Sequence, residues 1–120
     1  MREIIHDFVT KNLNGFALVE DGIDRHGSVE WTMHAQDGEL HRYVIVALSS
    51  SSDGGYLIEI WAGVSDGLHF TRRLVRSQPA GMWLDSLDAL GHLMHDPIKH
   101  AKALAETLGK SDLEGTYVVA

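Results

Sequence analysis

Histidine is the residue type with which this chain could do chemistry most readily, because the sequence contains eight histidines and no cysteine. Without thiolates, a metal site would depend on imidazole and carboxylate ligands. His34 and His41 flank the turn residues Asp37-Gly38, so a two-residue turn places the two imidazoles directly opposite each other, with Cβ atoms about 5 Å apart. Zinc sites use three or four ligands, and the sequence indicates no third ligand beside this pair. We therefore predict two polar side chains on the solvent face of a hairpin, with no bound metal and no cofactor.

A second histidine group stands near the end of a helical pattern and comprises His92, His95 and His100, with Asp96 between the last two. Helical zinc motifs of the His-Glu-x-x-His type place their histidines four residues apart, with a glutamate between them. Here the first two histidines are three residues apart and the glutamate is missing. Histidines near the end of a helix also interact favourably with the helix dipole. We therefore predict a structural role for this group.

Patterns for nucleophilic, acid–base and phosphate chemistry are weak. No serine stands at a recognisable strand-to-helix elbow of the kind that serine hydrolases use, so the sequence assigns no catalytic triad. The Ser- and Gly-rich segment 49–55 lacks the Gly-Lys-Ser/Thr ending of a phosphate loop and precedes a strand pattern. The carboxylate pairs Asp85/Asp88 and Asp21/Asp24 stand where loops and first helical turns collect acids. No catalytic residue is predicted.

Hydrophobic periodicity indicates which elements would position these residues. From Met1 to Leu13 the apolar residues follow a helical period, and Asn14-Gly15 supplies a C-terminal stop. Between Phe16 and Arg76 the period changes to two, and Gly-containing turns interrupt it. This middle region predicts an antiparallel meander of about five strands.

Helical periodicity returns over residues 82–94, and Asp96-Pro97 has the residue types of a helix start. Gly109 closes this further helix, and the segment 116–119 is rich in β-prone residues. The sequence therefore predicts a single α+β domain over residues 1–120. It comprises an N-terminal helix, the meander, two C-terminal helices packed on the sheet and a final edge strand.

Turn geometry predicts the register of two hairpins. A two-residue turn at Asp37-Gly38 gives mostly apolar pairs on one face. These pairs are Ala35 with Leu40, Met33 with Arg42, Trp31 with Val44 and Val29 with Val46. A three-residue loop at Ser65-Asp66-Gly67 pairs Val64 with Leu68, Ala62 with Phe70 and Ile58 with Leu74. It also places Arg73 opposite Glu59, where a cross-strand ion pair would form.

The second face of the meander bears most on function. By alternation it carries Thr32, His34, His41, Tyr43, Ile45, Leu57, Glu59, Trp61, Thr71, Arg73 and Val75. A contiguous surface that mixes aromatic, aliphatic, imidazole and guanidinium groups is typical of protein interfaces. The alternative is that a helix, such as the N-terminal one, covers this face and makes the same residues core. The candidate binding residues that we select are Tyr43, Trp61, His34, His41, Glu59 and Arg73.

The charge balance limits the partners. Ten Lys and Arg against 17 Asp and Glu give a formal net charge of −7, which argues against nucleic acid and favours a protein partner with a basic or neutral surface. In many small domains such a charge serves solubility alone. The longest apolar runs, such as that from Tyr43 to Leu48, fall far short of the ~20 residues of a membrane-spanning helix. The first residues lack the pattern of a secretory signal, so we expect a cytoplasmic protein that contacts no membrane.

Three classes of function are compatible with these observations. The leading hypothesis is a non-enzymatic protein-binding domain that acts as a small acidic inhibitor, immunity-type protein, adaptor or chaperone. The second is a small-ligand-binding domain or a His-dependent enzyme, with or without a metal, that uses His34 and His41 together with Glu59 or Arg73. The third is a homo-oligomeric structural subunit, such as a homodimer, formed through the final strand or an open sheet edge.

Overall fold

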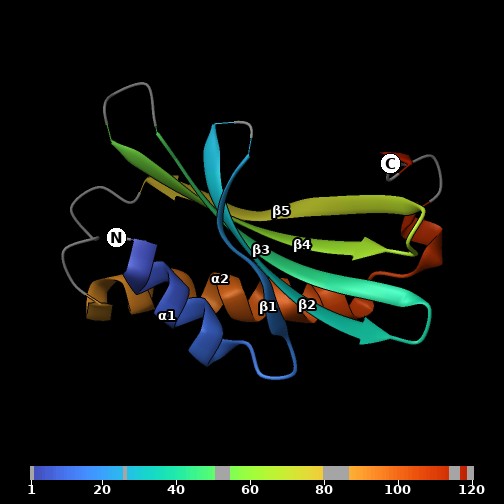
Figure 1. Ribbon diagram of the computed structural model, residues 1–120. Helices are drawn as coiled ribbons and strands as arrows, with labels where there is room; N and C mark the ends of the chain where they lie inside the picture. Colours follow the sequence, from blue (N-terminus) through green and yellow to red (C-terminus); the bar gives the residue numbers. More distant parts are fainter. Residues whose placement is uncertain (1, 26, 51–54, 80–86, 114–116, 119–120) are drawn as a thin grey trace.

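The strand-rich middle of the sequence forms one antiparallel sheet, as the period-two pattern predicts (Figure 1). The computed structural model describes residues 2–25, 27–50, 55–79, 87–113 and 117–118. Its elements are α1 (Arg2–Asn12), β1 (Ala17–Arg25), β2 (Ser28–Asp37), β3 (Leu40–Ser50), β4 (Tyr56–Ser65), β5 (His69–Pro79), α2 (Leu87–Thr107), the short 3-10 helix η2 (Lys110–Leu113) and β6 (Tyr117–Val118). Strands β1 to β5 pair in chain order, and the two-residue β6 pairs with the start of β5. The overall class is therefore α+β.

Both helices pack on the same face of the sheet (Figure 1). The buried cluster between helices and sheet includes Ile5, Phe8 and Val9 from α1 and Met94, Ile98, Ala101 and Ala105 from α2. The sheet contributes Trp31, Met33, Val44, Val46, Leu48, Ile58, Ile60 and Ala62. The N-terminal helix therefore does not cover the second face of the meander. In the described part of the chain, no helix has the length and apolar content to cross a membrane.

Helix α2 runs without a break through Pro97, where the sequence predicts the start of a separate helix. The buried apolar residues on the two sides of this proline are Met94, Ile98, Ala101 and Ala105. Their spacing continues one helical stripe across the proline. A proline inside a helix costs about 3 kcal/mol, but the burial of this stripe against the sheet offsets that cost. Residues 82–86 of the first predicted C-terminal helix lie outside the described residues.

The β2–β3 hairpin keeps the predicted faces but slides by two residues. Asp37 pairs with Leu40 around a two-residue turn at Gly38-Glu39. The pairs that follow include Met33 with Val44, Trp31 with Val46 and His34 with Tyr43. Because side chains alternate with period two, a shift of two residues leaves every side chain on its predicted face. His34 and His41 therefore share a face as diagonal neighbours, and the prediction that they are directly opposed is wrong.

The register of the β4–β5 hairpin is offset from the predicted one by an odd number of residues. The prediction of which β5 side chains lie on which face of the sheet is therefore wrong. Ser65 pairs with Phe70. The carboxylate of Asp66 accepts hydrogen bonds from the backbone N–H groups of Leu68 at 2.9 Å and His69 at 2.6 Å. This capped turn replaces the three-residue loop and shifts the register by an odd number of residues. The face that was predicted for Thr71, Arg73 and Val75 is taken by Phe70, Arg72 and Leu74.

A side chain from the sheet holds the C-terminal end of α2. Arg42 is only 9% exposed, and its guanidinium donates hydrogen bonds to the carbonyl oxygens of Ala105 at 2.5 Å and Leu108 at 2.7 Å. The same group forms an ion pair with Asp37 at 3.3 Å. The last carbonyls of a helix have no partner within the helix, and the last turn of α2 carries no basic residue of its own. Arg42 supplies the missing donors and ties α2 to β3.

Candidate functional site

The candidate site is the sheet face opposite the helices, which we call the open face. By pairing and alternation its side chains include Glu20 on β1, Glu30, Thr32 and His34 on β2, His41, Tyr43, Ile45 and Ala47 on β3, Glu59 and Trp61 on β4, and Phe70, Arg72 and Leu74 on β5. The apolar side chains of α1 and α2 join the cluster on the other face, and Figure 1 shows both helices on one side of the sheet. Within the described part of the chain, the open face therefore has no helix on it.

The sheet bends toward the open face. Arg72 on β5 lies over the Trp61 ring, with its guanidinium carbon 4.2 Å from the ring centroid, and reaches the carboxylate of Glu30 on β2 at 3.3 Å. In a flat sheet β2 and β5 would lie about 14 Å apart, because strands are spaced by about 4.8 Å. The contact therefore requires curvature. This bend explains why Ile45 and Ala47, which no described helix covers, are only 5% and 2% exposed.

Aromatic rings form a continuous row along one side of the open face. The ring centroids of His34 and Tyr43 lie 5.1 Å apart, and those of Tyr43 and Phe70 lie 5.9 Å apart at an interplanar angle of 65°. Such edge-to-face pairs are favourable beyond the area they bury. Gly63 leaves the space that Phe70 occupies, since a Cβ at this position would lie 3.3 Å from the Phe70 ring. Burial raises the pKa of the Tyr43 hydroxyl, and the carboxylate of Glu20 raises it further.

His34 and His41 form a direct hydrogen bond, with 2.9 Å between Nε2 of His34 and Nδ1 of His41. Their ring centroids lie 5.1 Å apart and the ring planes differ by 22°. A ring nitrogen of imidazole lies about 1.1 Å from the centroid of its ring. The 2.9 Å between the two nitrogens plus this distance in each ring equals the 5.1 Å between the two centroids. The two rings therefore meet edge to edge, close to one plane. The pKa of His34 is lowered by burial and by the charge of His41, which favours neutral imidazole.

The open face brings together most of the residues that the sequence selected. His34, His41, Tyr43, Glu59 and Trp61 all lie on it. Arg73 does not lie on it, because the register of the β4–β5 hairpin places Arg73 opposite Ala62 on the helix side of the sheet. There its guanidinium forms an ion pair with Asp112 of η2 at 2.7 Å.

Glu59 consequently lies opposite Ser77 and not opposite Arg73. Its carboxylate makes no hydrogen bond or ion pair within the described part of the chain. The sequence reasoning missed Glu30, Phe70 and Arg72. Asp66 was the sequence signal for Phe70 and Arg72. Its side chain caps the turn and so determines on which face of the sheet each side chain of β5 lies.

The other histidines whose contacts the structure describes lie beside single carboxylates or pairs of them, and His6 is 3.4 Å from Asp7 and 3.6 Å from Asp21. On the exposed surface His95 contacts its neighbour Asp96 at 3.2 Å, and His69 contacts Asp66 at 3.4 Å. The side chains of His92 and Asp85 lie outside the described residues, as does most of the segment 49–55. Among the residues that the structure describes, no three His, Asp or Glu side chains are grouped as a metal site requires.

The sequence reasoning missed a Gly-x-Ser-x-Gly spacing, the pattern of hydrolase nucleophile elbows, at Gly63-Val64-Ser65-Asp66-Gly67 with Ser65 in the middle. This segment leads from β4 into a hairpin turn and not into a helix. Ser65 is 5% exposed, and its hydroxyl accepts a hydrogen bond from the backbone N–H of Gly67 at 3.0 Å. His41 pairs with Ser65 across the strands, but no hydrogen bond joins this hydroxyl to an imidazole in the described structure. The nucleophile–base contact of covalent catalysis is therefore missing here.

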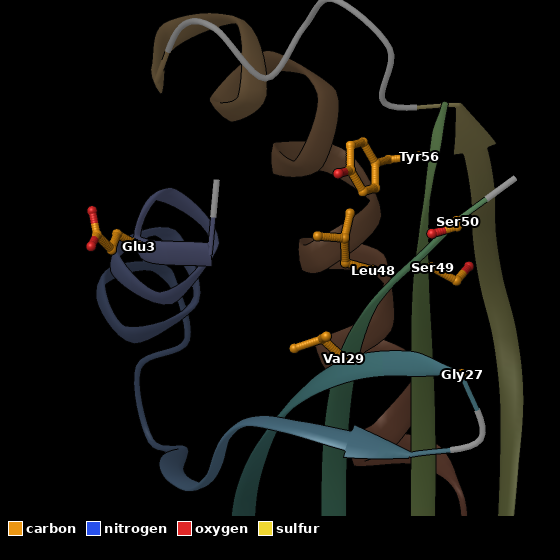
Figure 2. Close-up of a pocket in the computed structure, with 7 residues that line it drawn as sticks. All are labelled: Glu3, Gly27, Val29, Leu48, Ser49, Ser50 and Tyr56. Carbon is orange, nitrogen blue, oxygen red and sulfur yellow. The ribbon is translucent and has the colours of Figure 1, made fainter. Parts of the chain in front are cut away.

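A pocket of about 500 Å³ lies away from the open face, between the start of α1 and the ends of the strands (Figure 2). It is lined by Glu3, Gly27, Val29, Leu48, Ser49, Ser50 and Tyr56. Figure 2 shows Val29 and Leu48 directed toward α1, while the carboxylate of Glu3 points away from the strand residues. With no imidazole or paired carboxylates among these residues, the pocket offers no acid–base pair.

Comparison with known proteins gives no relative from which a function could be transferred: no family model, curated protein or solved structure matches this chain.

Proposed function

We propose that this chain is a non-enzymatic protein-binding domain that engages another protein through the open face. The role is that of a small acidic inhibitor, immunity-type protein, adaptor or chaperone. The observation that carries the proposal is the composition of this face, where Tyr43, Phe70 and Trp61 lie beside imidazole and guanidinium groups without a helix over them in the described structure. Tyr, Trp and Arg are the residue types enriched at interface hot spots.

The sheet edges support binding through the face in preference to the addition of a strand. The pairing of β1 with β2 is interrupted at two places, between Leu18 and Glu20 and between Asp21 and Ile23. The pairing of β4 with β5 is interrupted between Ile60 and Trp61. Bulges twist an edge strand and disfavour its pairing with another chain. A partner that contacts side chains of the open face does not require a regular edge.

The partner's surface is basic or neutral on this proposal. Of the acids beside or on the open face, Glu20 is paired with Arg25 and Glu30 with Arg72. Glu59 has no such partner within the described residues. Together with the net charge of −7, this carboxylate favours a lysine or arginine of the partner next to the aromatic rings.

The test is affinity capture with tagged protein from the cells that naturally produce it, followed by binding measurements with the purified partner. A Tyr43→Ala, Trp61→Ala variant should weaken the partner's affinity by at least about 30-fold, the effect of losing one interface hot spot. Tyr56→Ala is the matched control, because Tyr56 is an exposed aromatic residue that lines the pocket away from the open face. Equal affinities for wild type, the double variant and the control would refute binding through the open face.

Urea unfolding separates a binding defect from a folding defect. Trp31 is 1% exposed in the core, so Trp31→Ala should cost about 3–5 kcal/mol of stability. The Tyr43→Ala, Trp61→Ala variant should remain folded under the binding conditions. A variant that unfolds there would place the two rings in the structural core and would remove the proposal's main support.

A further inference from the structure

The hydrogen bond between His34 and His41 leaves room for one proton between the two rings. With 2.9 Å between the nitrogens and the rings close to one plane, one nitrogen must donate an N–H and the other must accept it with its lone pair. In the neutral pair, the ring that donates keeps a free lone pair on its outer nitrogen. That outer nitrogen is where the first added proton can bind without disturbing the contact.

The two protons therefore have opposite effects on the contact. The first makes the donor ring an imidazolium, and a charged donor strengthens a hydrogen bond to a neutral acceptor. The second must bind the accepting nitrogen, which places two N–H groups against each other at the site of the contact. The hydrogen bond is then lost, and two positive charges repel across the gap.

The surrounding charges do not cancel this effect. Among the side chains that the structure describes, the charged or titratable ones on the same face are Glu20 and Arg25 on β1, Glu30 on β2, Tyr43 on β3, Glu59 on β4 and Arg72 on β5. Tyr43 contacts the pair directly, and its raised pKa keeps it uncharged in the range where histidine titrates. Glu20 and Glu30 are held by arginines. The nearest strand-pairing neighbours on β4 are Gly63 and Ser65, which carry no charge.

We propose that His34 and His41 form a two-stage proton switch in the open face, in which the first proton tightens the pair and the second separates the rings. Burial and the charge of His41 both lower the pKa of His34, which agrees with His34 as the ring that takes the second proton. Between neutral and acidic pH the open face therefore gains two positive charges and loses its ordered ring pair. The effect of this change on a basic partner rests on the function proposed above, whereas the switch itself does not.

The experiment is an NMR titration of the isolated chain with ¹⁵N-labelled histidine. At neutral pH we expect a scalar coupling across the hydrogen bond between Nε2 of His34 and Nδ1 of His41, retained after the first proton and absent after the second. The two rings should titrate in separate steps, with His34 at lower pH. In His41→Ala the pKa of His34 should rise, and in the control His95→Ala, which alters an exposed histidine of α2, it should stay unchanged.

The proposal would be overturned by the absence of the coupling at neutral pH, by a coupling that survives both protonation steps, or by a His34 pKa that is insensitive to His41→Ala. Once a partner is purified, its affinity should fall at least about tenfold across the second step, since like charges across an interface are strongly unfavourable. A titration with the expected steps but no binding through the open face would refute the proposed function and leave the switch standing. Binding through the open face without a scalar coupling between the two rings would refute the switch and leave the proposed function standing.

Discussion

Replacing Arg42 by methionine should destabilise the protein through the end of α2. The guanidinium donates to the carbonyl oxygens of Ala105 and Leu108 and is nearly buried between the sheet and the helix. A hydrogen bond from a charged donor contributes about 1.5–3 kcal/mol, so two such bonds set a range of roughly 3–6 kcal/mol. Methionine keeps the packing of the apolar stem, so the loss is confined to the contacts of the guanidinium. We therefore expect the lower end, a loss of about 3 kcal/mol.

The assay is equilibrium unfolding in urea, read by circular dichroism and analysed by linear extrapolation. For a chain of this size each kcal/mol corresponds to about 4 °C, so the melting temperature should fall by about 12 °C. Arg73→Met is the matched control, because its ion pair with Asp112 is 54% exposed on the arginine side and such surface pairs contribute below about 1 kcal/mol. Amide hydrogen exchange should accelerate most near Leu104 and Leu108. Equal stability losses for the two variants would refute the argument that Arg42 caps α2.

Three further changes probe other parts of the fold. Pro97→Ala should raise the free energy of unfolding by about 1–3 kcal/mol, because Pro97 stands inside α2; a neutral or negative effect in urea unfolding would favour a helix that starts there. Gly63→Val should cost about 1–3 kcal/mol, since its Cβ meets the Phe70 ring, and Phe70→Ala in the same chain should restore part of that loss in a double-mutant cycle. Backbone N–H groups of His69 and Leu68 lower the pKa of Asp66 from 3.8 to about 2, so its charge stabilises the fold above pH 3.8 and this contribution disappears as the pH falls through 2. Unfolding measurements over this window should show a smaller decline for Asp66→Asn than for wild type, and parallel curves would contradict the assignment.

The elements of the fold could be predicted because the hydrophobic period changes sharply along the chain. Period two over the middle region gives the meander, and the helical stripe at Ile5, Phe8 and Val9 gives α1. The start of α2 was the main error among the helices. Asp96-Pro97 is a strong local signal, yet the apolar stripe continues across it from Met94 to Ile98. That stripe is buried against the sheet. A pattern of neighbouring residues in the sequence carries no information about this packing.

The open face shows how differently two register errors affect a prediction. A slip of two residues in β2–β3 left His34, His41 and Tyr43 on the predicted face, although their partners changed. In the β4–β5 hairpin the register differs from the predicted one by an odd number of residues. This difference exchanged the two faces of β5 and put Arg72 in the place predicted for Arg73. The deciding residue was Asp66, whose carboxylate binds two backbone N–H groups in the turn. Glycine at position 67 alone is compatible with several loop lengths, so the turn could not be fixed without that side chain.

The bend of the sheet determines what a partner could gain from the open face. Ile45 and Ala47 are already buried by the curvature, so a partner would recover little free energy from this apolar floor. The exposed apolar area lies around it, at the half-buried rings of Tyr43 and Trp61 and at Ile23 and Leu74, which are 46% and 47% exposed. Affinity on our proposal therefore depends on a few aromatic anchors.

The two charged groups on either side of Trp61 give this surface a preference. Arg72 already binds Glu30 and the Trp61 ring, so an acidic partner would have to displace these contacts before it could use the guanidinium. Glu59 has no contact of that kind to lose within the described structure. A basic partner can pair with Glu59 and leave the Arg72 contacts intact. The cost of breaking an existing ion pair therefore discriminates against acidic partners more strongly than the net charge alone would.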